Sequence, residues 1–218
     1  RGKLIDITAI ISERLVIRFQ HGAALHNAMD TLQLTDNRSI IVGTAGLFAQ
    51  RPLTYLSGEV GFAGSQHKDI IICEFGTFYV DAERGSIIQF SDSPKDITLQ
   101  NRVWFLNNLP FNIKKDFPEV DIDNTYHFRN PIGITMVYDN KYKRIIITKK
   151  DYKLKSDWKG IVTQSNNRFY HNLNEIAVTN TRYFIDRSFT ISYSPLLNQW
   201  ISFHSYEPNT YIANNQMY

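Results

Sequence analysis

The chain has 218 residues, of which 43% are hydrophobic and 21% charged, and its formal net charge is +3. This length allows one large domain or two small ones, and the apolar content excludes general disorder. Aromatic residues reach 13%, mostly Phe and Tyr, which favours β-sheets because flat rings pack well across strands. The small net charge does not by itself indicate a nucleic-acid-binding protein.

The N-terminal segment predicts a β-meander. Residues 7–11, 15–19 and 23–26 are short apolar runs separated by polar breaks, a pattern typical of antiparallel hairpins. An amphipathic helix over residues 6–18 is the competing interpretation, which the density of β-branched side chains disfavours. Residues 43–68 contain five glycines and one proline, so we expect a long connection with a functional or interfacial role.

Later stretches predict β-hairpins at residues 69–90, 132–150 and 188–206, where apolar runs flank polar turns. Residues 96–109 instead predict a single helix, which Pro110 ends. Its apolar residues can share one helical stripe: Ile97, Leu99, Val103, Trp104 and Leu106. This helix belongs to a helical and loop insertion at about 95–127, in which we expect residues 111–126 to form a loop.

A weak internal repeat links these hairpins. A strand–turn–strand pattern recurs around Asp81, Asp139 and Ser194 at nearly equal spacing. A propeller blade takes roughly 40–50 residues, so the spacing fits blades with insertions, although a β-sandwich gives similar hairpins. The fold class we expect is all-β, with the whole chain forming a partial set of β-propeller blades.

Residues 141–159 form a basic stretch. Its cations are Lys141, Lys143, Arg144, Lys149, Lys150, Lys153, Lys155 and Lys159, and Asp151 and Asp157 oppose them within the stretch. The cluster can face phosphates, or it can be a solvated edge and loop. Alternation along residues 144–150 leaves neither face purely charged, so we expect a strand packed on both sides, with most of the lysines facing solvent or acidic neighbours.

Catalytic and metal-binding patterns are weak. The six histidines show no HxH or HExxH spacing, and we expect His204 to be a hydrogen-bonded sheet residue: His21, His26, His67, His127, His171 and His204. Asp121 and Asp123 lack the later glycine and glutamate of a calcium loop. Asp81, Asp139 and Asp186 are the candidate carboxylates of a hydrolase, but their places beside turns fit Asx-turns better. We therefore expect no catalytic residues, no cofactor and no metal.

The single cysteine, Cys73, lies in an apolar run and is interpreted as a buried small hydrophobe rather than a nucleophile. No apolar stretch reaches the roughly 20 residues that span a membrane, so we expect no membrane anchor. The chain begins at Arg1 without an initiator Met. This beginning suggests a fragment of a longer polypeptide, whose remaining part completes open sheet edges and without which the fragment is prone to aggregate.

Several stretches together resemble the tail muzzle, or stabilisation, proteins of crAss-like bacteriophages. They are residues 64–68, 76–85, 104–105 with 109–111, 138–139 with 143–152, 189–194, and 200–208. The resemblance implies a virion tail protein of the nozzle-like β-propeller type, without catalytic residues. It also implies a ring of copies, bound to other tail proteins, that closes or narrows the distal channel, retains packaged contents and lets DNA exit, with transient DNA contact there. Assembly is expected in the host cytoplasm.

Two further function classes stay open. A glycan- or receptor-binding propeller should show a compact aromatic pocket, and a hydrolase a cleft with paired acids. A tail protein should bury broad faces against copies and neighbours. For the strand at residues 200–204, we expect Ile201 and Phe203 to pack between blades, with Trp200 against a neighbouring loop or subunit.

Overall fold

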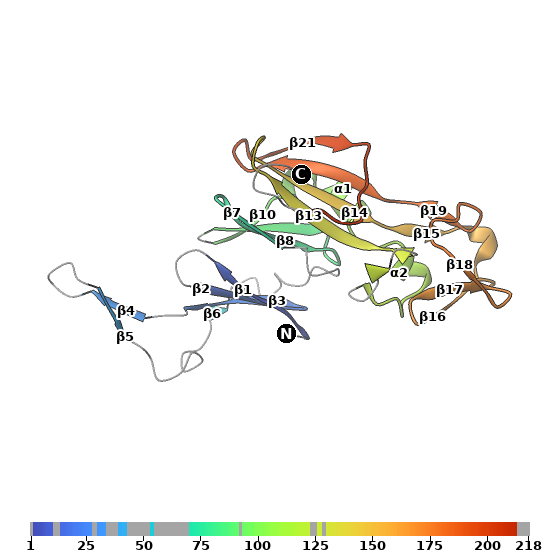
Figure 1. Cartoon of the computed structure of the whole chain (residues 1–218), viewed down its shortest axis with the longest axis horizontal. Helices are drawn as coiled ribbons and strands as arrows, with labels where there is room; N and C mark the ends of the chain where they lie inside the picture. The colour runs from blue at the N-terminus through green and yellow to red at the C-terminus, as the bar shows by residue number, and fades with distance from the viewer. Residues whose placement is uncertain are drawn as a thin grey trace. The chain divides into compact units, whose positions relative to one another are not determined.

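The computed structural model describes residues 2–10, 14–27, 30–33, 39–42, 53–54, 70–91, 93–122, 126–127 and 130–212. The chain divides into two units, residues 1–62 with 90–94, and residues 63–89 with 95–218. Strands dominate both units and helices are few and short (Figure 1). The expected all-β class is therefore confirmed.

The first unit contains the predicted N-terminal meander. Strands β1 (Leu4–Ile10), β2 (Arg14–Phe19), β3 (Gly22–Asn27) and β6 (Leu53–Thr54) form one antiparallel sheet in the order β1-β2-β3-β6. Strands β4 (Asp30–Gln33) and β5 (Ser39–Val42) form a separate ladder. The helical alternative for residues 6–18 is thus wrong. Apart from β6, the predicted long connection at 43–68 lies outside the described residues.

Two four-stranded sheets dominate the rest of the chain, and they confirm all three predicted hairpins. The first, in the order β10-β9-β8-β7, consists of β7 (Ile70–Cys73), β8 (Gly76–Asp81), β9 (Ser86–Phe90) and β10 (Pro94–Asp96). The second, in the order β13-β14-β20-β21, consists of β13 (Gly133–Asp139), β14 (Arg144–Lys150), β20 (Phe189–Ser194) and β21 (Gln199–His204). In the described part of the chain, the sheets do not close into a barrel or a propeller ring.

A shared core joins these two sheets. Phe78 of β8 and Tyr193 of β20 lie with their ring centroids 6.4 Å apart, and Ile87, Ile145 and Ile147 are fully buried in the same cluster. Every residue of β14 from Ile145 to Lys149 is buried, as predicted for a strand packed on both sides. On the second side, the hydroxyl of Tyr211 lies 2.6 Å from that of Thr148, so the C-terminal segment covers this part of the sheet.

The predicted helix is present but shorter, and its apolar face differs from the prediction. A 3-10 turn at Leu99–Asn101 leads into α1 (Arg102–Asn108). Phe105 and the adjoining Leu109 are fully buried. Three residues of the predicted stripe are exposed instead: Leu99, Val103 and Leu106. A second short helix, α2 (Ile113–Asp116), lies where a loop was expected.

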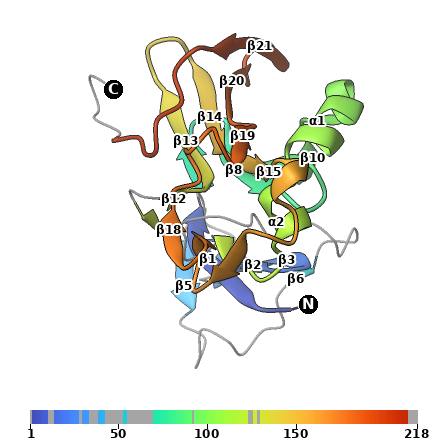
Figure 2. The ribbon, with the colours of Figure 1, turned by 90° about the vertical axis from the view of Figure 1, so that its right-hand side faces the viewer.

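Smaller ladders fill the insertion between β14 and β20. Strands β15 (Tyr152–Leu154) and β19 (Phe184–Asp186) pair, while β16 (Thr163–Ser165), β17 (Arg168–His171) and β18 (Asn174–Ile176) form a three-stranded sheet. A 3-10 turn, Ser156–Trp158, precedes this sheet. Strands β11 (Tyr126–His127) and β12 (Asn130–Pro131) form a further short ladder. Figure 2 shows the three-stranded sheet and α1 in different parts of the second unit.

Candidate functional site

The three repeat positions adopt the same turn. At the end of β8, Asp81 Oδ1 accepts a hydrogen bond of 3.1 Å from the backbone N–H three residues on. At the end of β13, Asp139 Oδ1 accepts the equivalent bond at 3.0 Å, and after β20 the hydroxyl of Ser194 accepts it at 3.2 Å. The weak sequence repeat therefore corresponds to a repeated strand–turn–strand unit.

The candidate carboxylates are occupied by these turns and by arginines. Asp139 is buried and pairs with Arg144 at 2.9 Å, and Asp81 lies 3.8 Å from Arg84. Asp186 accepts a 2.8 Å bond from the backbone N–H of Ser188. The structure thus assigns all three to turns, as the Asx-turn interpretation predicted.

His204 and Cys73 have structural contacts. His204 lies 3.4 Å from the hydroxyl of Ser202, and burial followed by the charge of Arg144 lowers the pKa of its ring. Cys73 packs partly buried against the core, and burial raises the pKa of its thiol, which keeps it protonated. In the ranges that the structure describes, no three His, Cys, Asp or Glu side chains gather as a metal site requires. His67 and the side chain of His127 lie outside those ranges.

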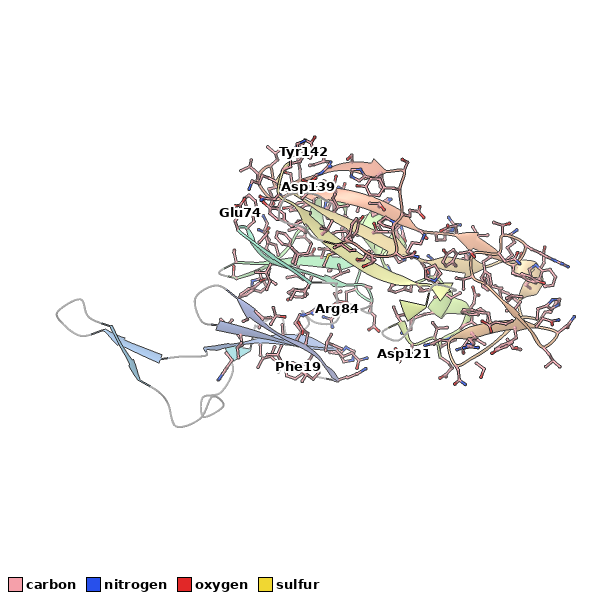
Figure 3. The ribbon with its side chains drawn as sticks, viewed as in Figure 1. Phe19, Glu74, Arg84, Asp121, Asp139 and Tyr142 are labelled. Carbon is pink, nitrogen blue, oxygen red and sulfur yellow. The ribbon has the colours of Figure 1, made fainter. Side chains whose placement is uncertain are left out.

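Carboxylates both near and distant in sequence pair with most of the cations in the basic stretch. Five of its eight cations have a carboxylate within 4.0 Å: Lys143 with Glu74, Arg144 with Asp139, Lys149 with Asp151, Lys150 with Glu207, and Lys159 with Asp116. Tyr138 also donates to Glu74, at 2.9 Å, and these contacts lower the pKa of the Glu74 carboxyl. Figure 3 shows Glu74, Asp139 and Tyr142 at one end of the sheets. The arrangement favours acidic neighbours over phosphates as partners of this stretch.

Lys149 and Asp151 form a fully buried ion pair that sequence reasoning missed. The two side chains have 0% exposure, and Nζ lies 2.7 Å from Oδ2. Lys149 Nζ also donates to the carbonyl oxygens of Asn108 and Pro110, at 2.7 and 2.9 Å. These carbonyls lie at the C-terminal end of α1, where a cation is favoured by the helix dipole.

Asp151 holds the start of the next helix. Its carboxylate accepts backbone hydrogen bonds from Asn112 at 2.8 Å and Ile113 at 3.2 Å, and a side-chain bond from Asn112 at 2.9 Å. The pair therefore joins the end of α1 and the start of α2 to β14. The only trace of this ion pair in the sequence is the Lys149-Lys150-Asp151 run at the end of the strand. The same run is equally typical of an exposed strand edge, so it did not reveal the pair.

An aromatic cluster around Trp158 is the feature to test against the glycan-binding alternative, which requires a compact aromatic pocket. The Trp158 ring lies 5.0 Å from that of His171 and 4.6 Å from that of Tyr183. The guanidinium of Arg182 lies over the Trp158 ring, 5.3 Å from its centroid. Because its neighbours pack against this ring, the cluster is better explained as packing of the 3-10 turn on β17 than as a platform for a sugar.

The prediction for β21 was wrong about which face is buried. Trp200 packs on the core, with its ring 5.0 Å from that of Tyr193, and its Nε1 donates a 3.0 Å bond to the carbonyl of Ile97. Ile201 and Phe203 point outward, with 48% and 61% exposure. The pairing with β20, which shifts register between Ser192 and Tyr193, sets this orientation.

Exposed apolar side chains on the 3-10 turn, α1 and β21 form the candidate interface. We call it the α1–β21 surface; its members are Leu99, Val103, Leu106, Ile201 and Phe203. Trp104 connects the two elements, with its ring 5.3 Å from that of Phe203. Exposed apolar surface of this kind marks sites of protein–protein contact.

The α1–β21 surface is also uncharged. Arg102 is the one charged residue from Leu99 to Asn108, and it turns away to the carbonyl of Gly85 and the hydroxyl of Ser86. β21 contains no Asp, Glu, Lys or Arg. A surface helix ordinarily has a polar outer face, whereas α1 exposes Val103 and Leu106 beside Asn107. These two apolar positions have the character of residues that a partner covers.

Comparison with known families agrees with a structural role. A family model described as Crassvirus muzzle protein matches residues 21–218. The chain belongs to the Crassvirus muzzle protein family. Muzzle family membership gives the chain a structural role in a phage virion, and the sequence resemblance is confirmed. No curated protein matches the chain. No described helix is long and apolar enough to cross a membrane.

Proposed function

We propose that this chain is a non-enzymatic component of the distal end of the phage tail. Copies of it form a ring, together with other tail proteins and the remaining part of a precursor polypeptide. The ring narrows or closes the channel, retains the packaged contents and allows the DNA to leave with transient contact. Assembly takes place in the bacterial host cytoplasm.

The observation that carries this proposal is the α1–β21 surface. A virion component has to bury broad apolar faces against neighbours, and the core of such an interface is depleted in charge. α1 and β21 offer uncharged apolar positions on adjacent elements. The muzzle family match supplies the virion context.

The β-propeller belongs to this proposal as well. Three sheets in the described part of the chain have four strands each, which is the strand number of a propeller blade. Sheet edges such as that of β21 are then paired in the assembled ring by neighbouring polypeptide.

The neutralised basic stretch supports passage of DNA rather than its retention. Each phosphate contact adds about −0.9 to the log–log salt slope of duplex binding, so a ring of copies multiplies even one contact per chain. Carboxylate partners for Lys143, Lys150 and Lys159 reduce such contacts.

An electron-microscopy map of the intact particle tests the proposal. We expect density for this chain at the distal tail, in several copies around the channel, with the α1–β21 surface covered. Density elsewhere in the particle, or a single copy with that surface in solvent, would refute it. A glycan array with the purified chain tests the receptor-binding alternative, for which we expect no specific binding.

A further inference from the structure

The tip of the β17–β18 hairpin carries an unusual residue. Asn172 and Leu173 form the two-residue turn between the paired residues His171 and Asn174, with φ angles of 49° and 65°. Such turns favour Asn followed by Gly, because a side chain is strained in the left-handed region. Leu173 is therefore strained in backbone conformation, and its side chain is 97% exposed to solvent.

Neither the strained backbone nor the exposed side chain of Leu173 stabilises the isolated chain. A fully exposed leucine gains no burial, and glycine would remove the strain without loss of any described contact. Strained backbone that persists at a surface points to a role in function. For a leucine at the tip of a hairpin, that role is insertion into an apolar surface of a protein partner.

The surroundings of Leu173 match an uncharged partner surface. Its neighbours Asn172 and Asn174 are uncharged, and Glu175 is paired with Arg168 at 3.3 Å. A tip without net charge enters an apolar site at low desolvation cost. The α1–β21 surface has the corresponding character.

The hairpin tip cannot reach that surface within one chain. Figures 1 and 2 show β17 and β18 in a different part of the second unit from α1 and β21. The hairpin tip and the α1–β21 surface can therefore contact each other only between two copies of the chain. A contact between two different patches is head-to-tail, and it generates a ring when the rotation closes.

We propose that Leu173 of one copy packs onto the α1–β21 surface of the next copy, between Val103 and Phe203. This inference rests on the proposed ring of copies and names the contact that builds it. In the assembled ring this contact buries both the Leu173 side chain and the α1–β21 surface.

Substitution of Leu173 tests the contact through self-association of the full 218-residue chain. In Leu173→Gly, we expect an unchanged or higher melting temperature together with at least tenfold weaker association in analytical ultracentrifugation. Leu173→Met, which keeps a large apolar side chain, should associate as the wild type does. Ile212→Ser, at another exposed apolar residue, should leave it unchanged. Wild-type association in Leu173→Gly, or a wild-type chain that stays monomeric at the highest soluble concentration, would overturn the contact.

Cross-linking tests the head-to-tail geometry. In a Cys73→Ser background, Leu173→Cys copies are mixed with Val103→Cys copies and treated with a short bismaleimide. We expect the 173–103 product in the mixture and little product in either variant alone. Products that form only as 173–173 or 103–103 would contradict a head-to-tail contact.

The map of the particle separates this inference from the proposed function. A distal tail position combined with wild-type association of Leu173→Gly overturns the contact and leaves the function standing. Loss of association in that variant, with the chain absent from the tail, supports the contact and refutes the function.

Discussion

The ammonium nitrogen of Lys149 lies 2.7 Å from Oδ2 of Asp151, and both side chains are fully buried. Through this pair, β14 holds the carbonyl end of α1 and the N–H end of α2. Because α1 supplies Val103 and Leu106 to the candidate interface, the pair positions that interface as well as the core.

Removal of one partner of this pair should be strongly destabilising. We expect Asp151→Ala to lower the free energy of unfolding by about 3–5 kcal/mol, because a buried ammonium loses its counter-charge. The double variant Lys149→Met/Asp151→Asn should cost less than the sum of its single variants. Urea unfolding measures each value. Arg168→Gln, which breaks an exposed pair, is the control and should cost about 0–1 kcal/mol.

Trp200 and Phe203 should respond differently to truncation. Trp200→Ala removes a ring that packs on Tyr193 and a hydrogen bond to Ile97, so we expect a loss of about 3 kcal/mol. Phe203→Ala should cost less than about 1 kcal/mol in the isolated chain, because that ring is 61% exposed. Thermal and urea unfolding of the two variants compare them, and the reverse order would contradict the observed register.

The repeated turn indicates which substitutions of Asp81 should preserve stability. Ser194 shows that a hydroxyl accepts the turn hydrogen bond as well as a carboxylate does. Asp81→Ser should therefore cost less than about 1 kcal/mol, whereas Asp81→Ala, which leaves a backbone N–H without this acceptor, should cost about 1–2 kcal/mol more. Equal stabilities in urea would show that the side-chain bond contributes nothing.

His204 should make the chain less stable in mild acid. Its folded-state pKa lies below the ordinary 6.5 because of burial and then Arg144, so the unfolded chain takes up the proton first. The free energy of unfolding should fall as the pH drops from about 6.5 to the folded-state pKa. His204→Gln should remove this part of the slope, and an NMR titration reads the pKa directly. A slope that is unchanged in the variant would refute the assignment.

The chain should bind duplex DNA weakly. With five of eight cations in the basic stretch paired to carboxylates, we expect a Kd no tighter than roughly 10⁻⁴ M at physiological salt. Fluorescence anisotropy over a range of salt concentrations gives the slope of log affinity against log salt concentration, and we expect a slope corresponding to at most about one phosphate contact. The double variant Glu74→Gln/Glu207→Gln removes the carboxylates that pair with Lys143 and Lys150, so it should make this slope steeper. A steep slope in the wild type would revive the phosphate-binding interpretation.

The sequence by itself determined the local structure. Apolar runs of β-branched residues with polar turns between them predicted the N-terminal meander and all three hairpins, because strand alternation and turn chemistry depend on neighbouring residues. The equivalence of Asp81, Asp139 and Ser194 was visible for the same reason: each accepts a bond from a residue three positions along the chain.

Only the tertiary structure decided which faces are buried and which charges are paired. The helical stripe with Val103 and the outward face of β21 were misassigned, because each element has large apolar side chains on more than one face. The sheets packed against them decide which of these side chains are buried. Lys149 reads as an exposed cation in the sequence, yet its partners include carbonyl oxygens some 40 residues away in the chain. Contacts between such distant positions form only when the sheets and helices pack, so no local pattern encodes them.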